Sequence, residues 1–166
     1  MNRRKVVLVA LTGLLLACTC AHAAREEYEF EVSVSIPTSR FHVLPADPGW
    51  LSREQRLQWS LLNSTLGGLR KDFDVKNEGG AIEARLDGEA VLSNGDDRHD
   101  INLQVLFNGK ELKVGQAVEV VSSADGRQGK RVLLEITPQL PSDGVYKPGK
   151  YFGNVNMMFN AVLPGA

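Results

Sequence analysis

The sequence predicts an all-β sandwich, and three observations point to it. Short segments rich in β-branched and aromatic residues recur along the chain, separated by turn dipeptides such as Asp87-Gly88, Asn94-Gly95 and Asn108-Gly109. Beyond the first 23 residues, no segment has the apolar periodicity of a long helix. The residues from Tyr28 to Ile36 alternate without exception between apolar and polar, which is the pattern of a strand with one buried face.

The first 23 residues have the pattern of a cleaved export signal. Arg3-Arg4-Lys5 forms a basic start, residues 6–17 form an apolar run, and Ala21-His22-Ala23 matches the small-x-small pattern before a cleavage site. The apolar run is too short for a comfortable membrane span, which needs about 20 residues. Because Leu15-Leu16-Ala17-Cys18 resembles a lipobox, acylation of Cys18 is an alternative route of processing.

Cleavage after Ala23 leaves 143 residues, the size of one ordinary domain. Both cysteines, Cys18 and Cys20, lie in the removed segment, so the mature chain has no disulfide, no thiolate nucleophile and no cysteine metal ligand. The mature chain carries 16 basic and 20 acidic residues, a net charge of −4, and this balance disfavours nucleic-acid binding.

The predicted strands lie between turn signals along the whole mature chain. They cover residues 28–36, 40–45, 57–62, 69–76, 80–86, 101–108, 117–121, 131–137 and 150–162. Ser52 suits the cap of a short helical turn or loop over residues 50–56. The glycine-containing segment 125–129 lacks the strand–loop–helix context of a phosphate loop, so we expect a hairpin loop there.

The two ends of the mature chain complement each other. The alternating strand lies at the start of the mature chain, where it can leave its own domain. The predicted strand 150–162 is the last one, whereas a seven-stranded immunoglobulin-like sandwich would normally follow it with one more edge strand. A sandwich without that strand exposes an unpaired edge and an apolar patch, and a strand from a second copy corrects both. Because such a contact joins head to tail, it propagates as a fibre.

The side chains expected at this contact follow from the alternation. Phe30, Val32, Val34 and Ile36 are expected to insert into the neighbour, with Tyr28 at the rim, and Pro37 is expected to end the exported strand. Burial of the four inserted side chains contributes about 6–12 kcal/mol before ordering costs. The acceptor groove is expected to include Val155, Met157, Phe159 and Ala161.

The order of segments resembles the alpha-fimbrial major pilins, the colonization factor antigen and cable-pilus type subunits of the chaperone–usher pathway. The resemblance spans the mature chain and is carried by its two ends and three tracts. These are Pro37-Thr38-Ser39-Arg40-Phe41-His42-Val43, Ile101-Asn102-Leu103-Gln104-Val105-Leu106-Phe107-Asn108-Gly109, and Gly149-Lys150-Tyr151-Phe152-Gly153-Asn154-Val155-Asn156-Met157-Met158-Phe159-Asn160-Ala161.

This resemblance implies an incomplete immunoglobulin-like sandwich of the Greek-key type. It implies a signal peptide over residues 1–23, a donor-strand extension over 24–37 and an immunoglobulin-like pilin domain over 38–166. The implied partners are copies of the same chain, a periplasmic chaperone that donates a strand, an outer-membrane usher and a tip adhesin. The implied location is a fimbrium on the bacterial surface, reached through the periplasm.

The sequence offers little support for a metal site, a sugar-binding surface or an enzyme. Asp96-Asp97-Arg98-His99-Asp100 is the densest polar cluster, but Arg98 opposes a cation, so we expect a solvated turn and not a metal site. Trp50 and Trp59 are expected in core or rim packing, although they would also suit a sugar-binding surface. We expect no catalysis, no cofactor and no nucleic-acid partner. The main alternative is a monomeric periplasmic or lipid-anchored β-sandwich binding module, and a secreted hydrolase is weaker because no catalytic constellation is recognisable.

Overall fold

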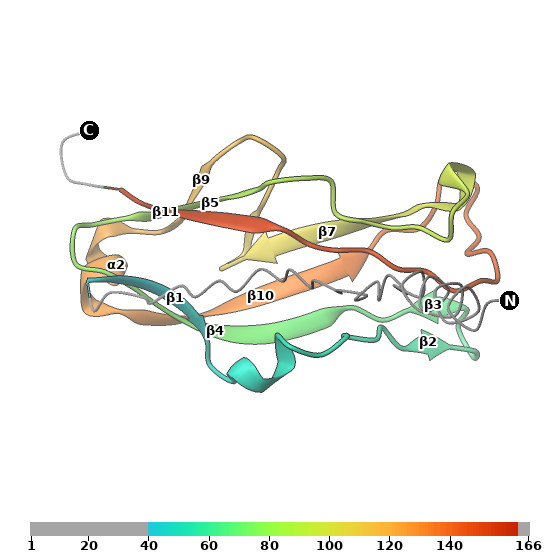
Figure 1. Cartoon of the computed structure of the whole chain (residues 1–166), viewed down its shortest axis with the longest axis horizontal. Helices are drawn as coiled ribbons and strands as arrows, with labels where there is room; N and C mark the ends of the chain where they lie inside the picture. The colour runs from blue at the N-terminus through green and yellow to red at the C-terminus, as the bar shows by residue number, and fades with distance from the viewer. Residues whose placement is uncertain (1–39, 163–166) are drawn as a thin grey trace, which may run out of the picture. The chain divides into compact units, whose positions relative to one another are not determined.

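Two antiparallel sheets pack their inner faces around one core. The computed structural model describes residues 40–162, which lie within one unit of the chain, Ile36–Ala166 (Figure 1). The larger sheet has six strands in the order β1-β4-β10-β7-β6, and β8 also pairs with β7. Its strands are β1 (Phe41–Pro45), β4 (Leu69–Asn77), β6 (Val91–Leu92), β7 (Ile101–Phe107), β8 (Lys110–Glu111) and β10 (Lys130–Pro138).

The smaller sheet has the order β11-β5-β9, and a separate hairpin stands beside the sandwich. The strands of the smaller sheet are β5 (Ile82–Leu86), β9 (Val118–Val121) and β11 (Met157–Ala161), and the hairpin is formed by β2 (Trp59–Ser60) and β3 (Thr65–Leu66). Three short helical segments complete the described chain: the 3-10 turns η1 (Pro48–Trp50) and η2 (Asp97–His99), and the helix α2 (Ser123–Gln128). The predicted all-β sandwich is confirmed.

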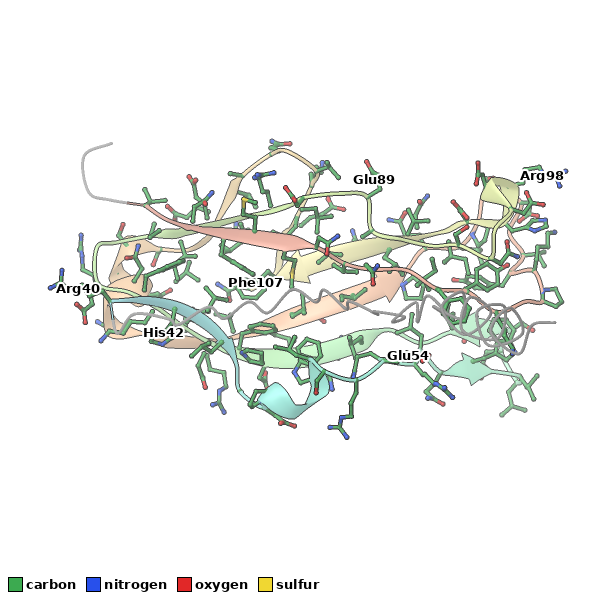
Figure 2. The ribbon with its side chains drawn as sticks, viewed as in Figure 1. Arg40, His42, Glu54, Glu89, Arg98 and Phe107 are labelled. Atoms are coloured by element: carbon green, nitrogen blue, oxygen red, sulfur yellow. The ribbon has the colours of Figure 1, made fainter. Side chains whose placement is uncertain are left out.

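Alternation along the strands sorts side chains between the core and the solvent. In β4 and β10, the inward positions Phe73, Val75, Val132 and Leu134 are buried. Ile82 and Ala84 of β5 and Val120 and Val121 of β9 meet them from the smaller sheet. Phe107 is fully buried in the middle of this core (Figure 2).

The outer face of the larger sheet is held by cross-strand ion pairs. Arg131 of β10 lies directly opposite Asp74 of β4, and its Nε and Nη2 atoms donate to the two carboxylate oxygens at 2.8 Å each. These hydrogen bonds lower the pKa of the Asp74 carboxyl below its ordinary value. Arg70 and Glu135 are also directly opposite each other, with Arg70 Nη2 2.9 Å from Glu135 Oε1.

Several predicted elements differ from those observed. Only residues 157–161 of the predicted strand 150–162 pair with a neighbouring strand along their length, and the preceding segment makes an isolated bridge between Phe152 and Ser93. The predicted strand 57–62 is cut to two residues by the turn of the β2–β3 hairpin. The helical turn lies at residues 48–50 and is capped by Asp47, not by Ser52. The segment expected as a hairpin loop forms α2, because the Ser122 hydroxyl accepts a hydrogen bond from the backbone N–H of Asp125.

Candidate functional site

A cavity of about 650 Å³ lies over the inner face of the larger sheet. Its floor is apolar and comes from three adjacent strands. The floor residues are Leu69 and Phe73 of β4, Leu134 and Ile136 of β10, and Leu103 of β7. Over this part of the sheet the core side chains therefore line a cavity, whereas farther along the sandwich they meet the smaller sheet directly.

Two segments form the walls of the cavity. One wall is the stretch that starts at Trp50, the last residue of η1, and runs to Leu57 without forming a strand. The other wall is the stretch from Tyr151 to Met157, which leads into β11. Gly153 allows the second wall to pass close to β6, because a Cβ atom at this position would collide with the carbonyl oxygen of Val91.

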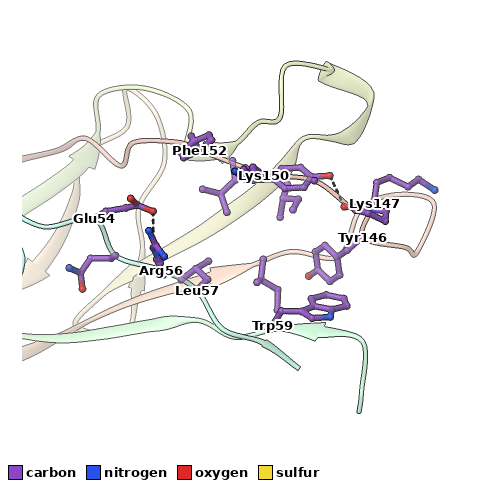
Figure 3. A pocket seen from close by; sticks show the side chains of 15 residues that line it. Glu54, Arg56, Leu57, Trp59, Tyr146, Lys147, Lys150 and Phe152 are labelled. Carbon is purple, nitrogen blue, oxygen red and sulfur yellow. Dashed lines mark hydrogen bonds and ion pairs between the residues drawn. The ribbon is translucent and has the colours of Figure 1, made fainter. Parts of the chain in front are cut away.

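A second cavity of about 740 Å³ continues the first toward the β2–β3 hairpin. The two share Glu54, Gln55, Leu57, Leu92, Tyr151 and Phe152 in their linings, so we treat them as one groove. Around the second cavity, the aromatic rings of Trp59 and Tyr146 meet edge to face, with their centroids 5.7 Å apart (Figure 3). Arg56 pairs there with Glu54 at 3.2 Å, and Lys147 pairs with Asp143 at 2.6 Å. The groove thus has an apolar floor and a mouth of aromatic side chains and ion pairs.

An edge strand borders the groove on the side of the smaller sheet. Among the described strands, β11 pairs only with β5. The carbonyl of Asn156 accepts a hydrogen bond from the N–H of Asp87, and the N–H of Val162 donates to the carbonyl of Ala81, both at 2.9 Å toward the β5 side. Because backbone polar groups alternate in direction along a strand, those of Met157, Phe159 and Ala161 face the other edge. That edge offers a row of main-chain donors and acceptors.

The family model for the CS1 type fimbrial major subunit matches residues 26–160 of this chain. The chain belongs to this family. It is therefore a structural subunit of a surface fimbria, a fibre built from copies of one protein. The pilin subunit CooA from enterotoxigenic Escherichia coli has a similar fold, with a TM-score of 0.61 and 20% identity over 73% of this chain and 86% of that one. No curated protein sequence shows significant similarity to the chain.

The acceptor residues predicted for the fimbrial subunit are placed in two groups. Val155 and Met157 line the groove. Phe159 lies outside its lining and packs against Phe107, with ring centroids 4.9 Å apart. Ala161 is exposed near the end of β11. The predicted donor residues Tyr28, Phe30, Val32, Val34 and Ile36 lie outside the described residues.

The floor of the groove and its first wall are not among the site residues that the sequence predicts. The floor residues are inward-facing positions of predicted strands, so alternation marks Leu103 and Ile136 as inward but does not show that they share a cavity. The wall from Trp50 to Leu57 carries no comparable signal, because its position depends on contacts made elsewhere in the fold. One such contact is the edge-to-face packing of Trp50 on Phe73, at 6.0 Å between ring centroids.

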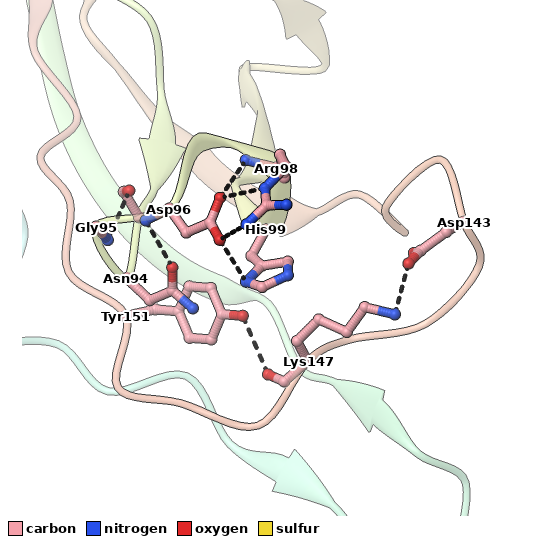
Figure 4. A network of polar contacts seen from close by, with 9 residues as sticks. Asn94, Gly95, Asp96, Arg98, His99, Asp143, Lys147 and Tyr151 are labelled. Carbon is pink, nitrogen blue, oxygen red and sulfur yellow. Dashed lines mark hydrogen bonds and ion pairs between the residues drawn. The ribbon is translucent and has the colours of Figure 1, made fainter.

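The acidic cluster of the fimbrial subunit forms the 3-10 turn η2 with its flanking residues; Asp97 and Arg98 are exposed, and the other three members are half-buried (Figure 4). Asp96 caps η2, and its two carboxylate oxygens accept hydrogen bonds from Arg98 Nε at 2.9 Å and Nη2 at 2.7 Å. His99 Nδ1 lies 3.7 Å from the same carboxylate. These contacts, above all the hydrogen bonds from Arg98, lower the pKa of Asp96 to about 2. Within residues 40–162, no three His, Cys, Asp or Glu side chains gather into a metal site.

The two tryptophans of the fimbrial subunit are placed in packing contacts. Trp50 lies against Phe73 and beneath the ammonium group of Lys71, which is 5.3 Å from the ring centroid. Trp59 packs on Tyr146 and is 44% exposed. The helices of residues 40–162 include none with the length and hydropathy needed to span a bilayer.

Proposed function

We propose that this fimbrial subunit polymerises by donor-strand exchange, in which residues 24–37 of one copy fill the groove of the next. The observation that carries the proposal is the apolar groove bordered by the edge of β11 with which no other described strand pairs. The segment from Tyr28 to Ile36 has the alternation that such a groove requires, with apolar side chains inward and Glu29, Glu31 and two serines outward. Main-chain pairing with β11 and burial of the apolar side chains then both stabilise the contact between the two copies.

The ends of the sandwich set the direction of the donated strand. The N–H of Glu78 donates to the carbonyl of Arg40, and Asn77 Nδ2 donates to the carbonyl of Val162, so Arg40 and the end of β11 lie at one end, which we call the Arg40 end. The β2–β3 hairpin lies at the opposite end, which we call the hairpin end (Figures 1 and 2). Subunits that repeat in one orientation must place the Arg40 end of one copy against the hairpin end of the next. The donated strand therefore runs antiparallel to β11 and leaves the groove at the hairpin end.

We infer that export, chaperone binding and exchange at the usher come before and during assembly. Residues 1–23 direct export to the periplasm and are removed, leaving the donor extension 24–37 and the pilin domain 38–166. A periplasmic chaperone fills the groove with its own strand, because an apolar groove beside a free edge aggregates if left uncovered. An outer-membrane usher then exchanges that strand for the extension of the next subunit, and a tip adhesin ends the fibre. The subunit has no catalytic role and holds no cofactor.

The sharpest test compares two adjacent positions in the donor strand. Val32→Asp places a charge on the inward face, where burial without a partner is costly, and we expect it to abolish fibre formation. Ser33→Asp places the same charge on the outward face, and we expect it to polymerise like the wild type. Electron microscopy and the fraction of protein in sedimentable fibres provide the readout. Fibres of normal length and yield from Val32→Asp would argue against donor-strand exchange.

A mass measurement tests the proposed processing. Intact mass spectrometry of the exported protein should give a chain that begins at Ala24 and carries no lipid. A chain that begins at an acylated Cys18 would instead support the lipid-anchored binding module.

A further inference from the structure

We propose that the hairpin end of each subunit is a second contact surface, which binds the Arg40 end of the next copy in the fibre. This inference rests on the proposed donor-strand exchange and adds to it a direct contact between the sandwiches themselves. Its partner is a second copy of this chain. Three observations support it. Apolar side chains are exposed around the groove mouth, the chain that connects the donor strand to the sandwich is short, and the Arg40 end carries positive charge that is unpaired among the described residues.

The turn of the β2–β3 hairpin exposes two large apolar side chains next to the groove mouth. Leu61 is 86% exposed and Leu62 is 97% exposed. They directly follow β2, whose Trp59 packs on Tyr146 at the mouth, and Val145 beside Tyr146 is 55% exposed. Adjacent exposed apolar side chains of this size on a folded domain commonly mark a contact with another protein.

The connecting chain is too short to hold successive subunits apart. Ile36 is the last residue expected to insert, and Arg40 is the first residue described in the sandwich. Four residue steps span at most about 14 Å even when fully extended. The Arg40 end of the donating copy must then lie within this distance of the groove exit, where the hairpin turn and its leucines lie.

The Arg40 end is suited to cover apolar side chains in a partly wet contact. Lys130 pairs with Asp125 and Lys76 pairs with Glu78, each at 3.2 Å, whereas Arg40 and Arg127 are exposed and form no ion pair with any described residue. Arginine can lay its aliphatic stem over an apolar surface while its guanidinium stays hydrated. At the hairpin end, η2 carries Asp97, which is exposed, forms no ion pair with any described residue and can serve as an acidic counterpart (Figure 1).

Carbene footprinting of the full mature chain tests the contact. The monomer is obtained by adding an excess of a synthetic peptide of residues 25–37, which caps the groove and blocks exchange between copies. We expect labelling of Leu61 and Leu62 to fall at least about fivefold in the fibre relative to this monomer, and labelling of Val114 to stay unchanged. Val114 is a suitable reference because it is 43% exposed and lies in the β8–β9 connection, away from both ends. Equal labelling of the leucines in fibre and monomer would overturn the contact.

Variants separate this inference from donor-strand exchange. Leu61→Ser/Leu62→Ser should still bind the 25–37 peptide with unchanged affinity, but its fibres should bend more, with a shorter persistence length in electron micrographs. Val114→Ser should leave both properties unchanged. Unaltered stiffness of the double variant would also overturn the contact. Failure of the wild-type chain to bind the peptide would instead overturn donor-strand exchange, and with it the basis of this inference.

Discussion

Asn77 connects three segments at the Arg40 end through one side chain. It is 3% exposed, and its Nδ2 donates to the carbonyls of Ala81 at 2.7 Å and Val162 at 3.3 Å. Its Oδ1 accepts from the N–H of Gly79 at 3.0 Å. Side-chain amides can serve donors and acceptors at once, so a single residue fixes the turn after β4 and the end of β11.

Replacement of Asn77 should therefore destabilise the sandwich. Asn77→Ala leaves the half-buried N–H of Gly79 without its partner and should lower the free energy of unfolding by about 1–3 kcal/mol. Asn77→Asp keeps the shape but removes the donor and buries a charge, so it should cost more at neutral pH. Urea unfolding of the two variants checks both values, and an aspartate variant as stable as the wild type would contradict this assignment.

Asp96 should titrate well below an ordinary aspartate. Because Arg98 stabilises its charged form, the pKa of Asp96 is about 2 in the folded chain, against 3.8 for a free side chain. Between these two values the unfolded chain binds the proton and the folded chain does not, so the contribution of Asp96 to stability is present above about pH 4 and is lost as the pH falls toward 2. Arg98→Gln should raise the pKa of Asp96 toward 3.8, as measured by the pH dependence of its carboxyl ¹³C shift. An unchanged midpoint would show that Arg98 is not the cause.

At the scale of elements, α2 depends on a glycine. Gly126 is buried, and a Cβ atom there would collide with the carbonyl oxygen of Gly80 in the turn after β4. Glycine thus allows α2 to lie directly on the backbone of this turn.

Gly126→Ala should act against the usual helix preference. Alanine in a helix is normally favoured over glycine by about 1 kcal/mol, but here the added methyl group should destabilise the fold by about 1–3 kcal/mol. Gly88→Ala is the matched control, because nothing lies within 4 Å of a Cβ atom at that position. Chemical unfolding distinguishes the two, and a Gly126→Ala variant at least as stable as the wild type would contradict the close packing.

The sequence predicted strands well where local pattern and tertiary packing agree. The predicted strands 69–76, 101–108 and 131–137 match β4, β7 and β10 closely, because each alternates over many residues and is bounded by turns. The sequence failed where a tertiary contact decides. Segment 125–129 has the composition of a turn, yet it forms α2 through the Ser122 cap and the packing of Gly126. Residues 150–156 look like part of a strand, yet Phe152 pairs with Ser93, and the missing side chain of Gly153 allows the segment to pass close to Val91 of β6, away from the ladder of β5.

For the whole molecule, the sequence predicts an acceptor groove but neither its floor nor its first wall. Of the four residues named for that groove, Val155 and Met157 line the cavity, whereas Phe159 and Ala161 do not. The floor requires knowledge of which strands adjoin in the larger sheet, and the wall from Trp50 to Leu57 requires its contact with β4. Pairing between distant strands is not encoded in local periodicity, so alternation alone predicts neither feature.

The sandwich should gain stability when its groove is filled. A full-length chain with Val32→Asp cannot donate its own strand, so it provides a recipient that stays monomeric. A peptide of residues 25–37 at about 100 times its dissociation constant should stabilise this recipient by about 2.7 kcal/mol, because it binds only the folded state. Thermal unfolding at rising peptide concentration gives the measurement, and the same peptide with Val32→Asp is the control. A melting temperature independent of the wild-type peptide would contradict the groove assignment.

In the proposed fibre, pairing along the edge of β11 opposite β5 also determines how the joint bears mechanical load. Tension along the fibre pulls the donated strand parallel to its own axis, since the strand runs antiparallel to β11 and its covalent connection leaves at the hairpin end. All main-chain hydrogen bonds along that edge then resist in shear and share the force, instead of breaking one at a time as they do when a hairpin is peeled apart. In that proposed arrangement, the same edge of β11 is the joint that transmits force from one subunit to the next.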